Sequence, residues 1–104
     1  MDIISEDGLF EWDSEKDLMN LKKHGITFND ILEVFEDPFR LVKYDSIHST
    51  VEEERYFSLG SIRGIVIIAV CHTDRDGRIR IISARKAEPR LRKVYIDYVS
   101  KNHR

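Results

Sequence analysis

The stretch IVIIAVCHTDRDGRIRIISAR, residues 65–85, decides the fold class of this chain. Its first part, Ile65–Thr73, is apolar on both alternating faces, which predicts a central strand covered on both sides. Asp76-Gly77 follows, and this dipeptide tolerates the positive φ values of a tight turn. Arg78–Arg85 then returns as a partner strand. The stretch therefore predicts an antiparallel hairpin.

A two-residue turn at the tip of this hairpin would fix which side chains share a face. It predicts three facing pairs, namely Ile68 with Arg85, His72 with Ile81, and Thr73 with Arg80. Because side chains alternate along a strand, one face is expected to carry His72, Ser83 and Arg85, and the other Arg78 and Arg80. A four-residue loop gives the same partition, whereas a three- or five-residue loop inverts it.

Two helices are expected before the hairpin, after a short strand at Leu9–Trp12. The first begins at a capping Asp13 or Ser14 and runs to about residue 23, because Gly25 is suited to the position after a helix. The second follows a capping box that starts at Thr27, and it carries apolar residues at helical spacing. Asp37-Pro38 ends it, since a residue before proline is pushed out of the α region.

The remaining elements complete an α+β domain. Strands are expected at Arg40–Tyr44 and Arg55–Gly60, before the hairpin. Pro89 suits the first turn of a final helix. The apolar stripe predicted for that helix consists of Leu91, Val94, Tyr95, Tyr98 and Val99. The predicted order is β-α-α-β-β-β-β-α, an antiparallel sheet sandwiched with two N-terminal helices and a C-terminal helix, in a single domain over residues 1–104.

The charge of the chain is segregated along its length. The net charge is −2, yet residues 1–54 hold 15 acids and 5 bases, and residues 55–104 hold 4 acids and 12 bases. The excess of bases in residues 55–104 suggests a basic surface, which would attract phosphates or an acidic partner. The alternative is that the two halves neutralise each other across the fold.

Basic side chains in two places are candidates for phosphate binding. Arg80 and Arg85 carry planar guanidinium groups, which grip a phosphate at two points. Lys16, Asn20, Lys23 and His24 fall on one stripe of the first predicted helix. Ordinary solvated charges would give the same patterns, at the strand ends and along the helix.

Other classes of site have no support in the sequence. Its four histidines and its acidic cluster lack the spacing of a zinc or calcium motif, so we expect neither metal nor cofactor. The single Cys71 lies inside an apolar run and is expected to be a buried thiol. The start of the chain is not that of a secretory signal, and its longest apolar run is far below the ~20 residues of a membrane span. A cytoplasmic protein is expected.

An ordered set of residues extends over nearly the whole chain. It consists of Phe10-Glu11-Trp12-Asp13, Lys16, Asn20, Lys23-His24-Gly25, Phe28, Val34-Phe35-Glu36-Asp37-Pro38, His48-Ser49, Glu54-Arg55, Gly60 and Arg80-Ile81-Ile82-Ser83-Ala84-Arg85. This set closely resembles the BrnT family of bacterial type II toxins, over residues 10 to about 95.

The resemblance implies a RelE-like fold, a ribonuclease activity that arrests translation, and a BrnA-like antitoxin with a ribbon-helix-helix DNA-binding domain. It also implies a hetero-oligomer that represses its own promoter, in which the antitoxin contacts the DNA. The RNA substrate would be cut, possibly on the ribosome, by attack of its own 2′-OH on the neighbouring phosphate. Such a reaction needs a base, an acid and cations, but no metal.

The predicted catalytic residues are Arg80, Arg85, His72, His24 and Lys23. The two arginines would stabilise the developing negative charge, and the other three would serve the proton transfers. The predicted RNA contacts are Lys16, Asn20, Arg55, Arg63 and Arg78. The alternative function is a non-catalytic basic module that binds an acidic partner or a ribosomal surface. A metal-dependent nuclease would be a third class.

Overall fold

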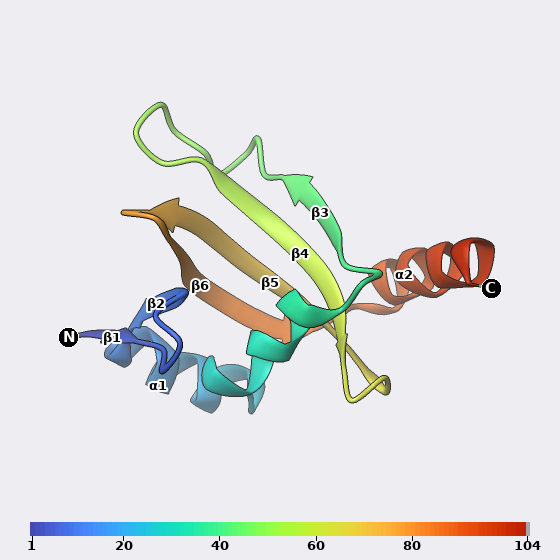
Figure 1. Ribbon diagram of the computed structural model, residues 1–104, viewed down its shortest axis with the longest axis horizontal. Coiled ribbons are helices and arrows are strands. Elements are labelled where there is room, and N and C mark those ends of the chain that lie inside the picture. The colour runs from blue at the N-terminus through green and yellow to red at the C-terminus, as the bar shows by residue number, and fades with distance from the viewer. Residues whose placement is uncertain (104) are drawn as a thin grey trace.

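The computed structural model describes residues 1–103 as one twisted sheet with helices on both sides (Figure 1). Its elements are β1 (Asp2–Ile4), β2 (Phe10–Asp13), α1 (Ser14–His24), η1 (Asn29–Glu36), β3 (Leu41–Tyr44), β4 (Arg55–Ile62), β5 (Val66–Arg75), β6 (Arg78–Lys86) and α2 (Pro89–Asn102). The six strands lie in the order β1-β2-β6-β5-β4-β3. The α+β class is therefore confirmed.

The tip of the β5–β6 hairpin forms as the sequence predicts. Asp76 has a φ of 52° and Gly77 a φ of 79°, so both turn residues adopt the left-handed conformation that Asp-Gly tolerates. His72 faces Ile81 and Thr73 faces Arg80, as expected.

Further from the turn the predicted register is wrong, because a bulge lies in β6. His72 pairs with Ile81 but Cys71 pairs with Ser83, which leaves Ile82 as the extra residue. Every later side chain of β6 is therefore on the opposite face from the one predicted. Ser83 and Arg85 lie on the face opposite His72, together with Arg78 and Arg80.

The sheet is mixed rather than antiparallel. β2 pairs with β6 in parallel, with Phe10 opposite Ile79 and Glu11 opposite Arg80. β1, which was not predicted, pairs antiparallel with β2 and extends that edge of the sheet. The parallel pairing depends on a contact between distant parts of the chain, so local sequence patterns do not contain it.

One face of the sheet, the covered face, is packed by η1 (Figure 1). The predicted second α-helix is a 3-10 helix in the structure, although its apolar side is buried as expected. Phe28, Ile31 and Val34 are fully buried there. Gly60 permits the close approach, because a Cβ at that position would lie 2.7 Å from the Val34 side chain and 2.9 Å from its carbonyl oxygen.

α2 packs over one end of the opposite face and projects beyond the sheet (Figure 1). Tyr95 is buried, and its hydroxyl donates a hydrogen bond to the Asp37 carboxylate. The predicted apolar stripe is only partly buried, since 49% of Val94 and 38% of Tyr98 remain exposed. No helix within residues 1–103 is long and apolar enough to cross a membrane.

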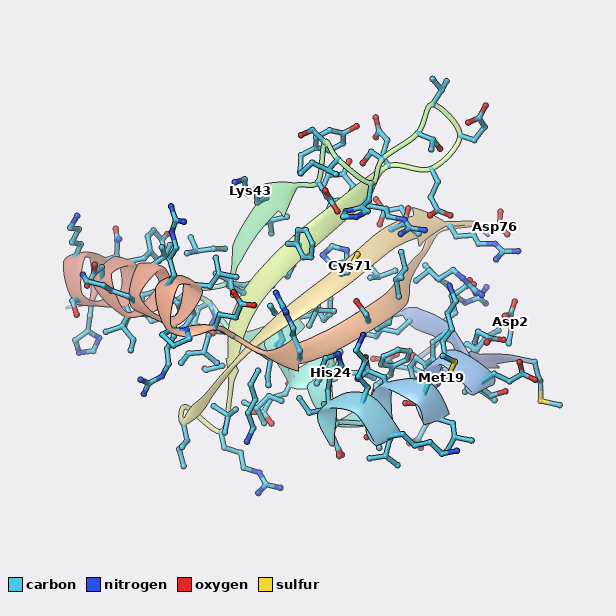
Figure 2. The ribbon with its side chains drawn as sticks, turned by 180° about the vertical axis from the view of Figure 1, so that it is seen from behind. Asp2, Met19, His24, Lys43, Cys71 and Asp76 are labelled. Atoms are coloured by element: carbon cyan, nitrogen blue, oxygen red, sulfur yellow. The ribbon has the colours of Figure 1, made fainter. Side chains whose placement is uncertain are left out.

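Away from α2, the face opposite η1 has no helix lying across it, and we call this surface the open face (Figure 2). Strand pairing and alternation place these residues on it: Glu11, Lys43, Arg55, Phe57, Cys71, Thr73, Arg75, Arg78, Arg80, Ser83 and Arg85. In Figure 2 Cys71 lies near the middle of this face, and α1 runs along its β6 edge.

Candidate functional site

A basic groove runs between α1 and the bulged part of β6. Lys16, Lys22, Lys23 and His24 line its helix side, with Met19 and the buried Asn20, and Ile82 and Ser83 line its strand side. The groove has a volume of about 470 Å³ and no carboxylate in its lining. Figure 2 shows Met19 and His24 on the helix beside β6. The structure therefore brings the predicted α1 stripe together with β6.

Asn20 attaches this helix to the sheet. Its Nδ2 donates hydrogen bonds to the carbonyls of Ala84 at 2.8 Å and Ile26 at 3.0 Å. Its Oδ1 accepts from the N–H of Ala84 at 3.1 Å. The side chain, predicted to contact RNA, is buried with its amide fully hydrogen-bonded, so its observed role is structural.

The two arginines of the predicted phosphate clamp have different surroundings. Arg85 is half-exposed on the open face, and its only ion pair within residues 1–103 is with the exposed Glu88 at 3.1 Å. Such surface pairs contribute little and exchange readily. Arg80 lies between the carboxylates of Asp2 and Glu11, with 17% of its side chain exposed. Its charge is therefore neutralised within the fold.

His72 lies on the covered face, apart from the groove. Its Nε2 is 2.8 Å from Ser58 Oγ, and its ring meets Phe35 edge-on at 5.2 Å. Burial and the positive charge of Arg40 lower its pKa from 6.5 to about 4. Its Nδ1 has no hydrogen-bond partner among the described residues. His72 is therefore on the opposite side of the sheet from the open face, apart from Lys23 and His24, with which it was predicted to serve the proton transfers.

The three other predicted RNA contacts are spread over the sheet. Arg55 lies on the open face, where its Nε donates to Glu53 at 2.7 Å. The Nε of Arg78 donates to the Gly8 carbonyl at 3.1 Å. Arg63 lies in the turn after β4, at the opposite end of that strand from Arg55.

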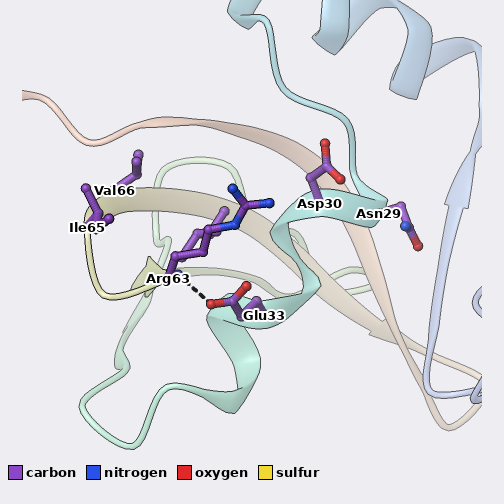
Figure 3. A pocket seen from close by; sticks show the side chains of 7 residues that line it. Asn29, Asp30, Glu33, Arg63, Ile65 and Val66 are labelled. Carbon is purple, nitrogen blue, oxygen red and sulfur yellow. Dashed lines mark hydrogen bonds between the residues drawn. The ribbon is translucent and has the colours of Figure 1, made fainter.

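Arg63 is part of a second pocket, of about 550 Å³, beside η1. Figure 3 shows it next to Asp30 and Glu33, and its backbone N–H donates to the Glu33 carboxylate at 2.5 Å. Ile65 and Val66 line the other side. These carboxylates oppose the binding of a phosphate at Arg63.

Lys43 and Phe57 are neighbours on the open face that the sequence analysis did not select. They face each other across β3 and β4, and Phe57 in turn faces Cys71. Phe57 is 38% exposed. The alternation of side chains along β4, which puts Phe57 on the same face as Arg55, could have indicated this position. An exposed aromatic ring among basic side chains provides a surface on which a nucleobase can stack.

A hydrogen-bonded Asp45–His48 pair lies in the loop between β3 and β4. His48 belongs to the set of residues that resembles the family, but its pairing with Asp45 was not predicted. Asp45 Oδ2 is 2.8 Å from His48 Nδ1, and Asp45 Oδ1 accepts from the backbone N–H groups of Ile47 and His48. Asp45 is only 4% exposed in its side chain, whereas the His48 side chain is 62% exposed. Burial would raise the pKa of Asp45, but the hydrogen bonds from His48 and Ile47 hold it below its usual value.

Within residues 1–103 there is no group of three or more histidine, cysteine, aspartate or glutamate side chains positioned to hold a metal ion.

Comparison with known proteins identifies the family. Residues 12–90 match the sequence model of the "Ribonuclease toxin, BrnT, of type II toxin-antitoxin system". The chain belongs to the BrnT family. A comparison with curated protein sequences finds no match.

A solved BrnT structure has a similar fold. The 1.1 Å crystal structure of the Brucella abortus ribonuclease toxin BrnT is 29% identical, with a TM-score of 0.56. The similarity covers 74% of this chain and 92% of the Brucella chain. Membership of BrnT gives RNA as the class of substrate and an antitoxin as the class of partner. The resemblance seen in the sequence is thereby confirmed at the level of family.

Proposed function

We propose that this BrnT-family protein is a metal-independent endoribonuclease that binds RNA across the basic groove and the open face. One observation carries the proposal: four basic side chains converge in a groove that has no carboxylate in its lining. Such a site attracts the phosphate backbone of RNA. The positive charge that a divalent ion supplies in other nucleases would come from these side chains.

The RNA strand would lie with its phosphates near Lys16 and Lys23 and a base against Phe57. The groove and the Phe57 ring are separated by Ser83 and Cys71, which are neighbours in the pairing of β5, β6 and β4. Cationic tracks beside exposed aromatics are typical of proteins that bind single-stranded nucleic acid. Arg55 would contact the backbone further along the same face.

The reaction would be attack of a 2′-OH on the adjacent phosphate, with departure of the 5′-oxygen and formation of a cyclic phosphate. Arg85 is suited to stabilise the extra negative charge, because its guanidinium is exposed and weakly paired. Lys23 would assist from the groove, and His24 beside it is suited to a proton transfer. Neither Arg80 nor His72 is included, since one is neutralised by carboxylates and the other is buried on the covered face.

The biological partner would be a BrnA-like antitoxin with a ribbon-helix-helix domain. The complex would be a hetero-oligomer that contacts promoter DNA through the antitoxin, and the free toxin would inhibit translation. A RelE-like classification of the fold is part of the same proposal. An antitoxin reading frame beside the toxin reading frame would support this assignment.

The test is to incubate the antitoxin-free protein with end-labelled RNA, with and without ribosomes, in the presence of EDTA. We expect cleavage that EDTA does not prevent, with products that carry a 2′,3′-cyclic phosphate. Cleavage abolished by EDTA and restored by a divalent ion would favour a metal-dependent nuclease. Binding without any cleavage, in both reactions, would favour the non-catalytic module.

A further inference from the structure

The Asp45–His48 pair has the geometry of an oriented base. A buried carboxylate holds one ring nitrogen of His48 at 2.8 Å, and the ring itself is 62% exposed. Since a neutral imidazole carries one N–H, the Nδ1–H donated to Asp45 leaves a lone pair on Nε2. We propose that His48 is the general base that takes the proton from the attacking 2′-OH, and that Asp45 positions it. This inference rests on the ribonuclease function proposed above.

Strand pairing places this pair beside the open face. Tyr44 pairs with Tyr56, and the next residue, Asp45, donates its N–H to the Arg55 carbonyl at 2.8 Å. Alternation then puts the Asp45 and Arg55 side chains on the same side of the sheet. Their charges also act on Cys71 in opposite directions, although burial is the main reason that its pKa is raised. The proposed base thus lies next to the Arg55 guanidinium. Arg55 pairs with Thr73 whereas Arg85 pairs with Ala69, so this inference moves the scissile phosphate from Arg85 to Arg55 and leaves Arg85 and the groove to bind neighbouring phosphates of the same strand.

The loop that carries His48 is fixed by its own hydrogen bonds. Ser49 Oγ accepts from the Arg55 N–H at 2.8 Å and donates to its carbonyl at 3.3 Å. The Ser49 N–H donates to the Asp45 carbonyl at 3.1 Å. These contacts tie the loop to the first residue of β4, so the imidazole is presented from a defined position. Preorganisation of this kind is what a general base requires.

The proposed step balances in atoms and charge. The 2′-oxygen forms a bond to phosphorus while its proton moves to His48 Nε2, and the bond from phosphorus to the 5′-oxygen breaks. The leaving 5′-oxygen takes a proton from solvent water, and the imidazolium later returns its proton to solvent. Asp45 stabilises the transient positive charge on the ring and stays ionised throughout.

The ordinary explanation of the pair is structural: His48 would simply satisfy a carboxylate that organises the loop. The two explanations differ in what the loss of the imidazole does. A structural role predicts lower stability with normal cleavage by the folded fraction. A general base predicts a stable protein that binds RNA and cuts it slowly.

The test compares His48→Ala with His103→Ala, which removes an exposed imidazole at the end of α2. Single-turnover cleavage and RNA affinity are measured for both proteins, with thermal unfolding as the check on folding. For His48→Ala we expect about a 100-fold or greater loss in cleavage rate, the usual contribution of a general base, with RNA affinity changed less than about threefold. Added imidazole is expected to restore part of the rate, because the side chain that it replaces is largely exposed.

A second variant, Asp45→Asn, tests the positioning role. An amide would present an N–H to His48 Nδ1, which forces the other tautomer and removes the lone pair from Nε2. We expect a similar rate loss that imidazole does not rescue, and a double variant no slower than His48→Ala alone. Normal cleavage by folded His48→Ala would overturn the inference while leaving the nuclease proposal intact. If the wild-type protein itself does not cleave RNA, the proposed function fails instead.

Discussion

Asn20 pairs with Ala84 in the way that a neighbouring strand residue would, by both accepting from its N–H and donating to its carbonyl. β2 pairs with β6 only at Ile79 and Arg80. Further along β6, the side chain of Asn20 on α1 makes the backbone hydrogen bonds that a neighbouring strand would make. The Asn20 amide therefore helps to hold α1, and with it the basic groove, against β6.

We predict that Asn20→Ala destabilises the protein by about 2–4 kcal/mol, because it leaves buried backbone groups of Ala84 and Ile26 without partners. Chemical denaturation followed by circular dichroism would measure this free energy. Asn102→Ala, which removes an exposed amide at the end of α2, is the matched control and should change stability by less than about 0.5 kcal/mol. Equal stability of the two variants would contradict the role given to Asn20.

RNA binding should depend on the groove lysines through their charge. Lys16→Ala and Lys23→Ala are each expected to weaken RNA affinity and to reduce the slope of log affinity against log salt by about 0.7, the value for one contact to a single strand. Fluorescence anisotropy with a labelled single-stranded RNA at several salt concentrations gives both quantities. Lys101→Ala, on the exposed side of α2, should leave the slope unchanged.

Arg85→Ala should abolish cleavage and toxicity while the fold and antitoxin binding persist. The exposed pair with Glu88 contributes little to stability, so the unfolding temperature should stay within about 3 °C of the wild-type value. Growth arrest on induction, together with the RNA cleavage assay, measures the effect. Arg92→Ala on α2 is the control for loss of one exposed arginine. Full toxicity of a well-expressed Arg85→Ala protein would remove this residue from the mechanism.

His72 should make stability depend on pH. Its pKa is about 4 in the folded protein and 6.5 when unperturbed, so the unfolded chain binds more protons between these values. The free energy of unfolding is therefore expected to fall as the pH is lowered from about 6.5 to about 4, by up to roughly 3 kcal/mol from this residue. Denaturation of the wild type and of His72→Gln across this range would show the effect. The variant should lack that part of the slope, and a pKa near 6.5 by NMR titration of His72 would contradict the prediction.

Sequence patterns located the β5–β6 hairpin but not the bulge that shifts its register. Asp76-Gly77 specified the turn, and the pairs next to it followed. Nothing in Ile81-Ile82-Ser83 distinguishes a bulged strand from a regular one, because β-branched residues continue through the irregularity. The predicted common face of His72, Ser83 and Arg85 failed for this reason.

The candidate site was only partly accessible to the same reasoning. The helical spacing of Lys16, Lys23 and His24 correctly grouped side chains that now line one groove. The ion pairs of Arg80 depend on β1 and β2. The parallel pairing has no local signal, whereas Asp7-Gly8 was a turn signal for the β1–β2 hairpin that the sequence analysis did not use. His48 follows Asp45 by three residues, a spacing that becomes meaningful only when the loop is seen to bury the carboxylate.

The parallel pairing of β2 with β6 joins two segments that lie almost at opposite ends of the chain, with Phe10 opposite Ile79. During synthesis β2 and α1 leave the ribosome long before β6 exists, and α1 has no sheet edge to rest on until then. The lysines of the groove are thus brought against the sheet only after β6 has been made. A nascent chain that ends before β6 therefore lacks the finished RNA-binding surface.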